Sequence, residues 1–399
     1  MSWVNWKRKP SPNPAGATGI LGLDLNASRV RAMCCAQGRP PRSVALEEPH
    51  EELPLAVSLE KSALNIGRSA LALVRKLPHQ VCLDFLNDLG TTREFKYGRH
   101  SLNATGLLDP ALRRMQSACP VPEHLTLSLP VYLTSAQVSI LNQLLEKAKL
   151  PWRGSAALPL ALLAATDPAE RRPPLALIVD VDDHALSAAL VSSNADQVRL
   201  LGTAIQPKLN FRVWKDRLLN ALSDRCVRVC RRDPRDSAVA EQTLYDQLDD
   251  ALDRVLQGQN VEFTVRSEHW YQQLPQQPED FVSYCSGLVK QTVAMARELV
   301  QGLLPEPPQA VWLTYAAGRL PGLAMALHQH MAERTGAAML PADAGARAAV
   351  LLAPRWLREE LPRTHLDTSI LLPESPRDPR SVTREVSIPA PRRTSRFDH

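Results

Sequence analysis

Glycine is scarce in this sequence, which has 17 glycines among 399 residues. That is about 4% of the chain, where roughly 7% is usual. Loops that hold phosphate groups depend on glycine, because a Cβ atom would keep the backbone away from the ligand. The shortage therefore argues against a set of glycine-rich nucleotide loops.

Paired cysteine motifs and long apolar runs are also missing. The seven cysteines are odd in number and form no C-x-x-C pair, so we expect reduced structural thiols rather than a metal site. No run of about 18 apolar residues occurs, and the N-terminus lacks the hydrophobic stretch of a signal peptide. The sequence thus predicts a cytoplasmic protein without a transmembrane segment.

Net positive charge is confined to the two ends of the chain, whose formal charge is +5 in total. Residues 1–16 contribute +3 and residues 373–399 contribute +2, so the body between them is neutral. A neutral body lacks the basic surface that nucleic-acid phosphates require, and we expect no nucleic-acid partner. Because both ends are rich in proline, they predict a disordered basic arm (1–16) and a disordered Pro/Arg-rich tail (373–399).

Between these ends, apolar strands alternate with amphipathic helices, which predicts an α/β fold. The expected strands are 20–25, 30–35, 125–133, 175–181, 185–191 and 311–314. The expected helices are a Thr134-capped helix to 148, a charged stretch at 214–257, a helix from Asp280 to 304, and 342–357.

One strand-and-turn pattern occurs twice. Asp24 ends an apolar strand just before a polar turn, and Asp180 does the same 156 residues later. This repeat predicts two duplicated domains that face each other across a cleft. Two unrelated hairpins are the alternative.

Several motifs resemble, in order and spacing, the nucleotide-binding domain of DnaK-type heat-shock chaperones, within the actin, sugar-kinase and chaperone ATPase superfamily. The resemblance covers roughly residues 18–360. Residues 22–28 (GLDLNAS) are similar to the first phosphate loop, and residues 127–137 (LSLPVYLTSAQ) to the family's T-V-P-A-Y-F-N-D-A-Q motif. Residues 179–184 (VDVDDH) stand where the family has its second phosphate loop, and residues 311–321 (VWLTYAAGRLP) resemble its adenosine motif.

The resemblance implies a two-lobed actin-like ATPase fold, with duplicated ribonuclease-H-like domains around a cleft. It assigns residues 17–173 to lobe I and 174–340 to lobe II, with a helical subdomain at about 206–304. Residues 341–372 are expected to form a closing helix that returns to lobe I. We see no counterpart of the β-sandwich that grips peptides in DnaK-type chaperones, and therefore expect no peptide-clamping domain.

The nucleotide-binding positions of the family are only partly kept. By resemblance, the cofactor-binding positions are Asp24, Asn26, Ser28, Asp180, Gly318 and Arg319, and Asp24 and Asp180 are the candidate magnesium ligands. Asn26 replaces a glycine of the first loop, and Asp182, Asp183 and His184 replace the glycines of the second. Carboxylates there would repel a triphosphate. Leu158 stands at the position of the family glutamate, and Tyr315 and Ala316 replace the paired glycines of the adenosine motif.

Each of these positions also has an ordinary structural interpretation. Asp24 and Asp180 are either metal-side carboxylates or acids that cap the hairpin turns. His184, beside two acids, belongs either to a divalent-metal site or to a solvated acidic turn. Arg319 either stacks on a ligand in the cleft or lies on the surface over apolar neighbours.

We therefore predict a degenerate pseudo-ATPase without a catalytic residue and without a cofactor, which acts as an interaction or regulatory scaffold for other proteins. The alternative is a chaperone-like ATPase of weak activity that binds ATP or ADP with magnesium. Residues 24–32 (DLNASRVRA) also resemble the opening of PilM-like proteins, which are cytoplasmic assembly scaffolds. The match at 130–137 argues against that branch.

Overall fold

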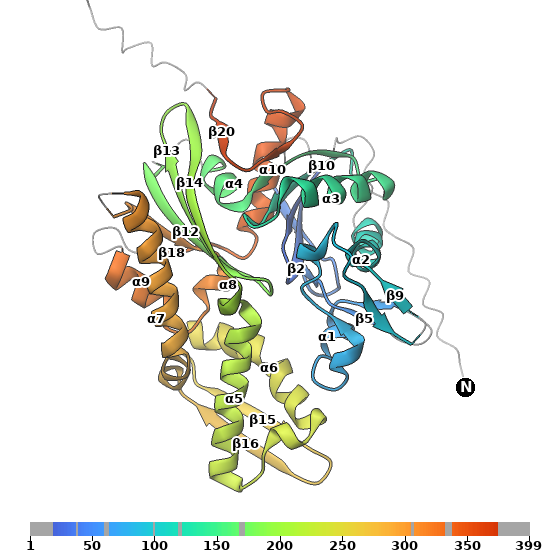
Figure 1. The fold of residues 1–399 in the computed structure, drawn as a ribbon, viewed down its shortest axis with the longest axis vertical. Coiled ribbons are helices and arrows are strands. Elements are labelled where there is room, and N and C mark those ends of the chain that lie inside the picture. The colour runs from blue at the N-terminus through green and yellow to red at the C-terminus, as the bar shows by residue number, and fades with distance from the viewer. Residues whose placement is uncertain are drawn as a thin grey trace, which may run out of the picture.

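A computed structural model describes residues 19–36, 39–59, 64–98, 100–118, 122–166, 172–304, 307–331 and 337–373. The expected basic arm, and the expected tail from residue 374 onward, lie outside these residues. The described chain is a mixed α/β structure with two large sheets, which confirms the expected class (Figure 1). No helix within these ranges is long and apolar enough to cross a membrane.

The first sheet is built on an antiparallel hairpin and has the strand order β19-β11-β10-β1-β2-β3, with β4 also paired to β2. Its strands are β1 (Gly19–Leu25), β2 (Arg29–Ala36), β3 (Arg42–Val44), β4 (Glu52–Pro54), β10 (His124–Leu129), β11 (Trp152–Ala157) and β19 (His365–Leu366). β10 ends four residues earlier than expected, because Pro130 has no N–H with which to continue the ladder.

The second sheet has the order β18-β17-β12-β13-β14-β20. Its strands are β12 (Leu175–Val181), β13 (Leu186–Ser193), β14 (Gln197–Gln206), β17 (Ala310–Leu313), β18 (Ala337–Met339) and β20 (Ser369–Leu371). The sequence pattern did not predict β14 or β18.

The two sheets share one arrangement. In each, an antiparallel hairpin (β1–β2 or β12–β13) is extended beside its first strand by parallel strands and beside its second strand by an antiparallel strand. Asp24 and Asp180 occupy the same place, one residue before the end of the first hairpin strand. The repeat seen in the sequence is therefore also a repeat in strand order.

Two helices pack between the sheets (Figure 1). They are α4 (Leu158–Ala164) and α10 (Ala344–Leu357). α10 lies against β1 so closely that a Cβ atom on Gly22 would come within 2.5 Å of a Val350 methyl carbon, which explains a glycine there. Residues 341–372 do more than return to the first sheet as a closing helix, because β19 pairs with β11 and β20 pairs with β14 of the second sheet.

The outer helices are α2 (Ala104–Ala118) and α3 (Ser135–Lys147) on the first sheet, and α7 (Pro278–Leu303), α8 (Tyr315–Gly318) and α9 (Leu323–Met331) near the second. Among the outer helices, the apolar periodicity predicted α3 and α7 but not α2, α8 or α9. Thr134 caps α3 in a capping box with Gln137, as its sequence position predicted. Asp280 was expected to begin α7, but Gln277 is the N-cap, and Asp280 accepts the backbone N–H of Gln277 from the third helical position.

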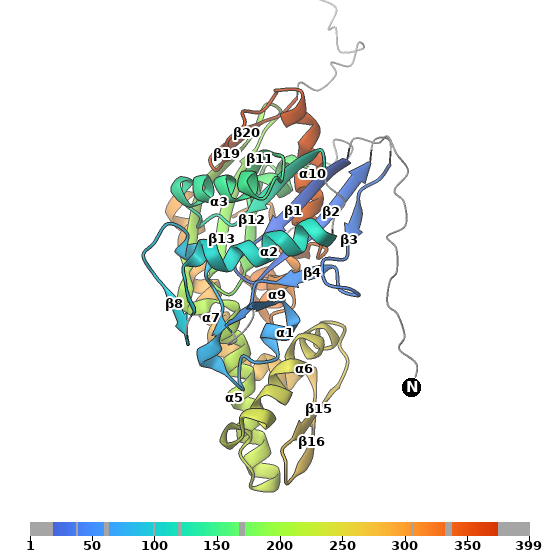
Figure 2. The ribbon, with the colours of Figure 1, turned by 90° about the vertical axis from the view of Figure 1, so that its right-hand side faces the viewer.

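A distal arm extends away from the second sheet (Figure 2). It consists of α5 (Phe211–Cys230), α6 (Ala238–Leu256), β15 (Val261–Arg266) and β16 (Tyr271–Gln276). The charged stretch expected at 214–257 is broken where Arg231 adopts a left-handed conformation and Pro234 begins a short 3-10 turn. The region expected to be a helical subdomain therefore also contains a β-hairpin.

A small unit near the first sheet faces this arm. It contains β5 (Val57–Leu59), β6 (Leu64–Ile66), α1 (Arg68–Leu71) and β7 (Val81–Cys82), followed by the hairpin of β8 (Phe95–Tyr97) and β9 (His100–Leu102). Both views place α1 beside α6 (Figures 1 and 2). A cleft lies between the small unit and the arm: it is lined by Leu71 of α1 and by Phe211 and Tyr245 of the arm, and it reaches the two hairpin turns at Ser28 and Asp183.

Candidate functional site

The two hairpin turns meet at the inner end of the cleft, where Asp182 is the central residue. Its Oδ2 accepts the backbone N–H of Ala27 at 3.0 Å and the hydroxyl of Tyr132. Its Oδ1 accepts the N–H groups of His184 at 2.9 Å and Ala185 at 3.0 Å. Asp182 is 1% exposed. One carboxylate of the second turn is thus inserted into the first turn.

The first turn is held in shape by its own side chains. Asn26 Oδ1 accepts the N–H groups of Ser28 and Arg29, each at 3.0 Å, in an Asx turn. Ser28 Oγ accepts the backbone N–H of Asp183 at 2.8 Å. Asn26 and Ser28, expected to contact a nucleotide, therefore contribute to the turn itself and to its contact with the second turn.

Burial shapes the electrostatics of this contact. Burial, followed by the nearby Asp180 carboxylate, raises the pKa of Asp182 to about 7, although its hydrogen bonds oppose the shift. Burial and the Asp182 carboxylate also raise the pKa of Tyr132 well above its ordinary value, so this phenol remains a donor. The Tyr132 ring lies 4.6 Å from the His184 ring, centroid to centroid.

Asp24 and Asp180, the candidate magnesium ligands, both border a cavity of about 10 Å³. That volume is roughly the size of one water molecule, too small for a hydrated magnesium ion. Burial raises the pKa of Asp24 to about 6, and Asp180 adds to the shift while Arg29 opposes it. Asp180 Oδ1 accepts the hydroxyl of Thr314 at 2.6 Å. Within the described ranges, no cluster of His, Cys, Asp or Glu is arranged to hold a metal.

Apolar and backbone groups fill the rest of this inner end. Leu158, at the position of the family glutamate, is 5% exposed and borders the same small cavity. A Cβ atom on Gly345 of α10 would lie 2.7 Å from Cγ of Asp24. α10 therefore closes this side directly behind the two aspartates.

The cleft outside the turns has a volume of about 690 Å³ and is lined by many charges. The basic lining residues are Arg29, Arg31, Arg68, Lys215 and Arg319. The acidic ones are Glu51, Glu52, Asp183, Asp249, Asp250 and Asp253. All five basic side chains have an acidic partner within 4.0 Å. The cleft therefore offers no unpaired positive charge, among the described residues, to a phosphate.

Arg319 illustrates this pairing, and of its two alternatives the surface position is wrong. Its side chain is 13% exposed and contacts Asp249 at 2.7 Å and Asp253 at 3.3 Å. Its guanidinium carbon lies 5.0 Å from the Phe211 ring centroid and 5.7 Å from that of Tyr315. Stacking does occur, but on the protein's own aromatic rings rather than on a ligand.

Lys215 was not recognised from the sequence. Its Nζ contacts Asp249 Oδ2 at 2.6 Å and lies over the Phe211 and Tyr245 rings. Burial alone would lower the pKa of Lys215, but Asp249 raises it overall. Lys215 and Arg319 in turn hold the pKa of Asp249 well below its usual range, against the effect of burial.

The motif that resembles an adenosine site has a structural use. Tyr315 donates its hydroxyl to Asp253 at 2.8 Å and lines the cleft. Gly318 allows close packing, because a Cβ atom there would lie 2.4 Å from Cγ of Met339 on β18. Tyr315 thus occupies space in the cleft, and Gly318 serves the contact between α8 and β18.

Polar contacts also join the small unit to the arm across the cleft. The guanidinium of Arg75 pairs with Asp216 and, at 3.5 Å, with Glu241, and its backbone N–H donates to Gln242 Oε1 at 2.7 Å. Gln242 Nε2 returns a hydrogen bond to the Leu71 carbonyl at 3.1 Å. These contacts tie the small unit to α5 and α6 of the arm.

A second group of contacts lies nearer the turns. Asp84 contacts His184 Nδ1 at 3.1 Å and Arg212 at 3.3 Å. The hydrogen bond from Asp84 raises the pKa of His184, although burial opposes the shift. His184 therefore pairs with Asp84 across the cleft. This differs from both interpretations offered by the sequence, a divalent-metal site and a solvated acidic turn.

Sequence reasoning missed most of these partners. Tyr132 lies inside the motif at 127–137, so its position could have drawn attention. Arg75, Asp84 and Gln242 lie outside every motif, and their cross-cleft partners are 100 or more residues away in sequence. No local signal marks them.

No protein-family model matches this chain, and no curated protein sequence is significantly similar to it. The function is therefore inferred from the site. Chemically, the two turns bind each other through Asp182 and Ser28, and Lys215 and Arg319 of the cleft already have acidic partners.

Proposed function

We propose that this chain is an actin-like pseudo-ATPase that acts as an interaction or regulatory scaffold for other proteins. The shared strand order of the two sheets and the facing hairpin turns support the actin-like, two-lobed part of the proposal. The paired charges of the cleft and the apolar Leu158 support the loss of ATPase activity.

One observation carries the proposal. By resemblance, backbone N–H groups of residues 26–28 would hold the terminal phosphates of ATP. Here the Ala27 N–H donates to Asp182, and Ser28 Oγ is engaged by the Asp183 N–H. A phosphate would have to displace a carboxylate that has four hydrogen bonds, and hydrogen bonds to charged groups contribute about 1.5–3 kcal/mol each. On this proposal, the Asp182 carboxyl group already occupies a backbone donor that a terminal phosphate would need.

Weak nucleotide binding is the second candidate, and the size of the cleft favours it. A volume of about 690 Å³ lies within the range of ligand pockets, roughly 300–1,000 Å³. Lys215 and Arg319 line it and would suit phosphate if they were released from Asp249. That release would leave a carboxylate unpaired, which disfavours this candidate.

Thermal unfolding with and without ATP and magnesium separates the two candidates. At 100 times its dissociation constant, a ligand stabilises the folded state by about 2.7 kcal/mol. A 10 μM site would therefore raise Tm by several degrees at about 1 mM ATP. We expect no shift and no phosphate release, and a clear shift would favour the second candidate.

The scaffold part of the proposal needs its own test. We expect the proteins retained by the immobilised full chain to be the same with ATP, with ADP and without nucleotide. Release of a retained partner by ATP would contradict a nucleotide-independent scaffold. Arg319→Gln is a useful comparison, because it alters the cleft and leaves the outer surfaces unchanged.

A further inference from the structure

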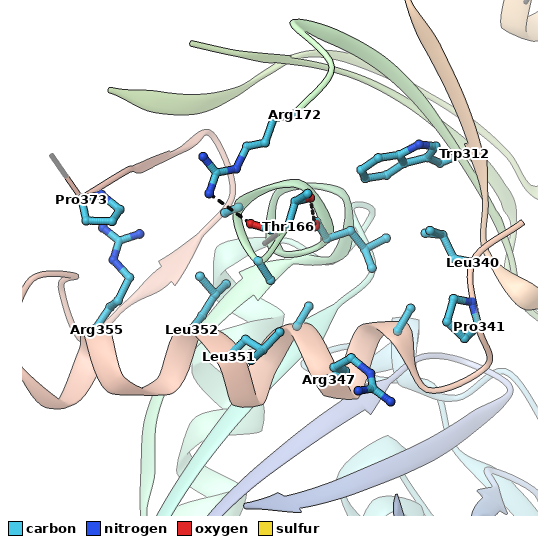
Figure 3. Close-up of a pocket in the computed structure, with 15 residues that line it drawn as sticks. Thr166, Arg172, Trp312, Leu340, Pro341, Arg347, Leu351, Leu352, Arg355 and Pro373 are labelled. Atoms are coloured by element: carbon cyan, nitrogen blue, oxygen red, sulfur yellow. Dashed lines mark hydrogen bonds between the residues drawn. The ribbon is translucent and has the colours of Figure 1, made fainter. Parts of the chain in front are cut away.

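A second hollow, which we call the α10 groove, lies on another side of the molecule. It has a volume of about 740 Å³ and is bordered by α10 from Ala344 to Arg355, the end of α4 and Trp312 of β17 (Figure 3). It shares no lining residue with the cleft between the turns. Its size is that of a site for a small organic ligand.

The charge of the α10 groove is unbalanced. Three arginines and no acid are found among the described residues that line it. Arg347 is neutralised by Asp343 at 2.5 Å. Arg355 shares its partner Glu360 with Arg358, and within the described ranges Arg172 donates to the Thr166 carbonyl, at 3.2 Å, and to no acid. Positive charge therefore remains at Arg172 and Arg355.

Burial makes this charge significant. Arg355 is 8% exposed, and its Nη1 has no hydrogen-bond partner in the part of the chain that the structure describes. Nε of Arg172 is likewise buried without a partner. Burial and the positive charge of Arg355 lower the pKa of Arg172. Because a buried donor without an acceptor is destabilising, an anion bound between these two guanidinium groups would be strongly favoured.

The groove has a polar end and an apolar end. Figure 3 shows Arg172 and Arg355 toward the same end as Pro373, whereas Trp312, Leu340 and Pro341 lie at the other. Leu351 and Leu352 of α10 lie between the two ends. Leu351 is 47% exposed, so an apolar surface is available along the groove.

The ends of this chain do not complement the groove. Residues 1–18 carry a net charge of +3 and residues 374–399 a net charge of +2. A positively charged segment is disfavoured beside two incompletely paired arginines. An anion is the occupant whose charge complements the groove.

We propose that the α10 groove binds a small amphipathic carboxylate, with its carboxyl group between Arg172 and Arg355 and its apolar body along Leu352 toward Trp312. Arginine suits this role because its guanidinium group can hold a carboxylate through two parallel hydrogen bonds. Trp312, Leu351 and Leu352 supply apolar contacts that stabilise an aliphatic or aromatic part of the ligand. This inference does not depend on the proposed function of the cleft.

Titration of the full chain with decanoate tests the proposal, with 1-decanol as the uncharged probe of equal chain length. Binding is followed by calorimetry and by tryptophan fluorescence. We expect decanoate to bind at least about tenfold more tightly than decanol, the factor expected from one charge-assisted hydrogen bond. Trp312→Phe should remove most of the fluorescence change.

Two matched variants locate the site. Arg172→Gln should weaken decanoate binding about tenfold or more, because it removes an incompletely paired charge. Arg347 lines the same groove, but its charge is already paired with Asp343. Arg347→Gln should therefore change decanoate binding by less than about twofold. Thermal unfolding confirms that both variants fold. Equal binding of decanoate and decanol, equal losses in the two variants, or no binding of decanoate would each overturn the proposal.

Discussion

Replacement of Asp182 by alanine is the most informative perturbation of the hairpin contact. The change removes the acceptor of four hydrogen bonds, and two of the donors belong to Ala27 and Ala185, which are 1% and 2% exposed. Each buried donor left without an acceptor costs about 1–3 kcal/mol. We therefore expect Asp182→Ala to lower the free energy of unfolding by about 2–6 kcal/mol at pH 5.5.

The pH dependence of this loss is a stricter test. The pKa of Asp182 is raised to about 7 in the folded chain, whereas it is about 3.9 in an unfolded chain. Between these values the folded state binds the extra proton, so the wild type loses stability as pH rises. At about 1.4 kcal/mol per pKa unit, the wild type should lose about 2 kcal/mol from this group between pH 5.5 and 8. Asp182→Ala lacks this loss, so its deficit relative to the wild type should shrink by that amount.

Urea denaturation at both pH values measures these free energies. Asp183→Ala is the matched control, because it removes the neighbouring carboxylate and retains all four hydrogen bonds of Asp182. Its cost should be about 1 kcal/mol or less, as for partly exposed charges. A deficit for Asp182→Ala that stays constant or grows with pH, or one no larger than that of Asp183→Ala, would refute the reasoning.

Three further perturbations follow from the same structure. Wild-type Tm should fall as pH rises from about 5 to about 8, because Asp24, Asp182 and His184 all have raised pKa values in the folded chain. Calorimetry across this pH range measures Tm, and a Tm that rises with pH would contradict the prediction. Gly345→Val should cost about 1–3 kcal/mol through overpacking against Asp24, as measured by chemical denaturation. Arg75→Ala should cost only about 1 kcal/mol in stability but should speed amide exchange in α1 and α6, and unchanged exchange there would contradict the cross-cleft contact.

Local patterns predicted much of the fold. The two hairpins follow from apolar runs separated by polar turns, and the start of α3 follows from Thr134 with Gln137 three residues later. Element ends were less predictable. The break after α5 depends on one residue in a left-handed conformation, Arg231. The start of α7 depends on Gln277 as the N-cap, a position usually occupied by smaller polar residues.

The candidate site was predictable in outline only. The sequence indicated that Asp182 and Asp183 disfavour a phosphate, but local patterns contain no information about where a side chain points. Only the folded chain shows that Asp182 accepts the Ala27 N–H, 155 residues away. The cation partners of the acids in the cleft depend on the same long-range packing, as Lys215 with Asp249 and Arg319 with Asp253 illustrate.

Calorimetric titration of nucleotide-free protein with ATP and magnesium tests the central claim most directly. If Asp182 occupies the place of the terminal phosphate and the cleft cations are already paired, no binding should be detected up to about 1 mM ATP, which corresponds to a binding free energy weaker than about −4 kcal/mol. A dissociation constant tighter than about 10 μM, or about −7 kcal/mol, would contradict the account.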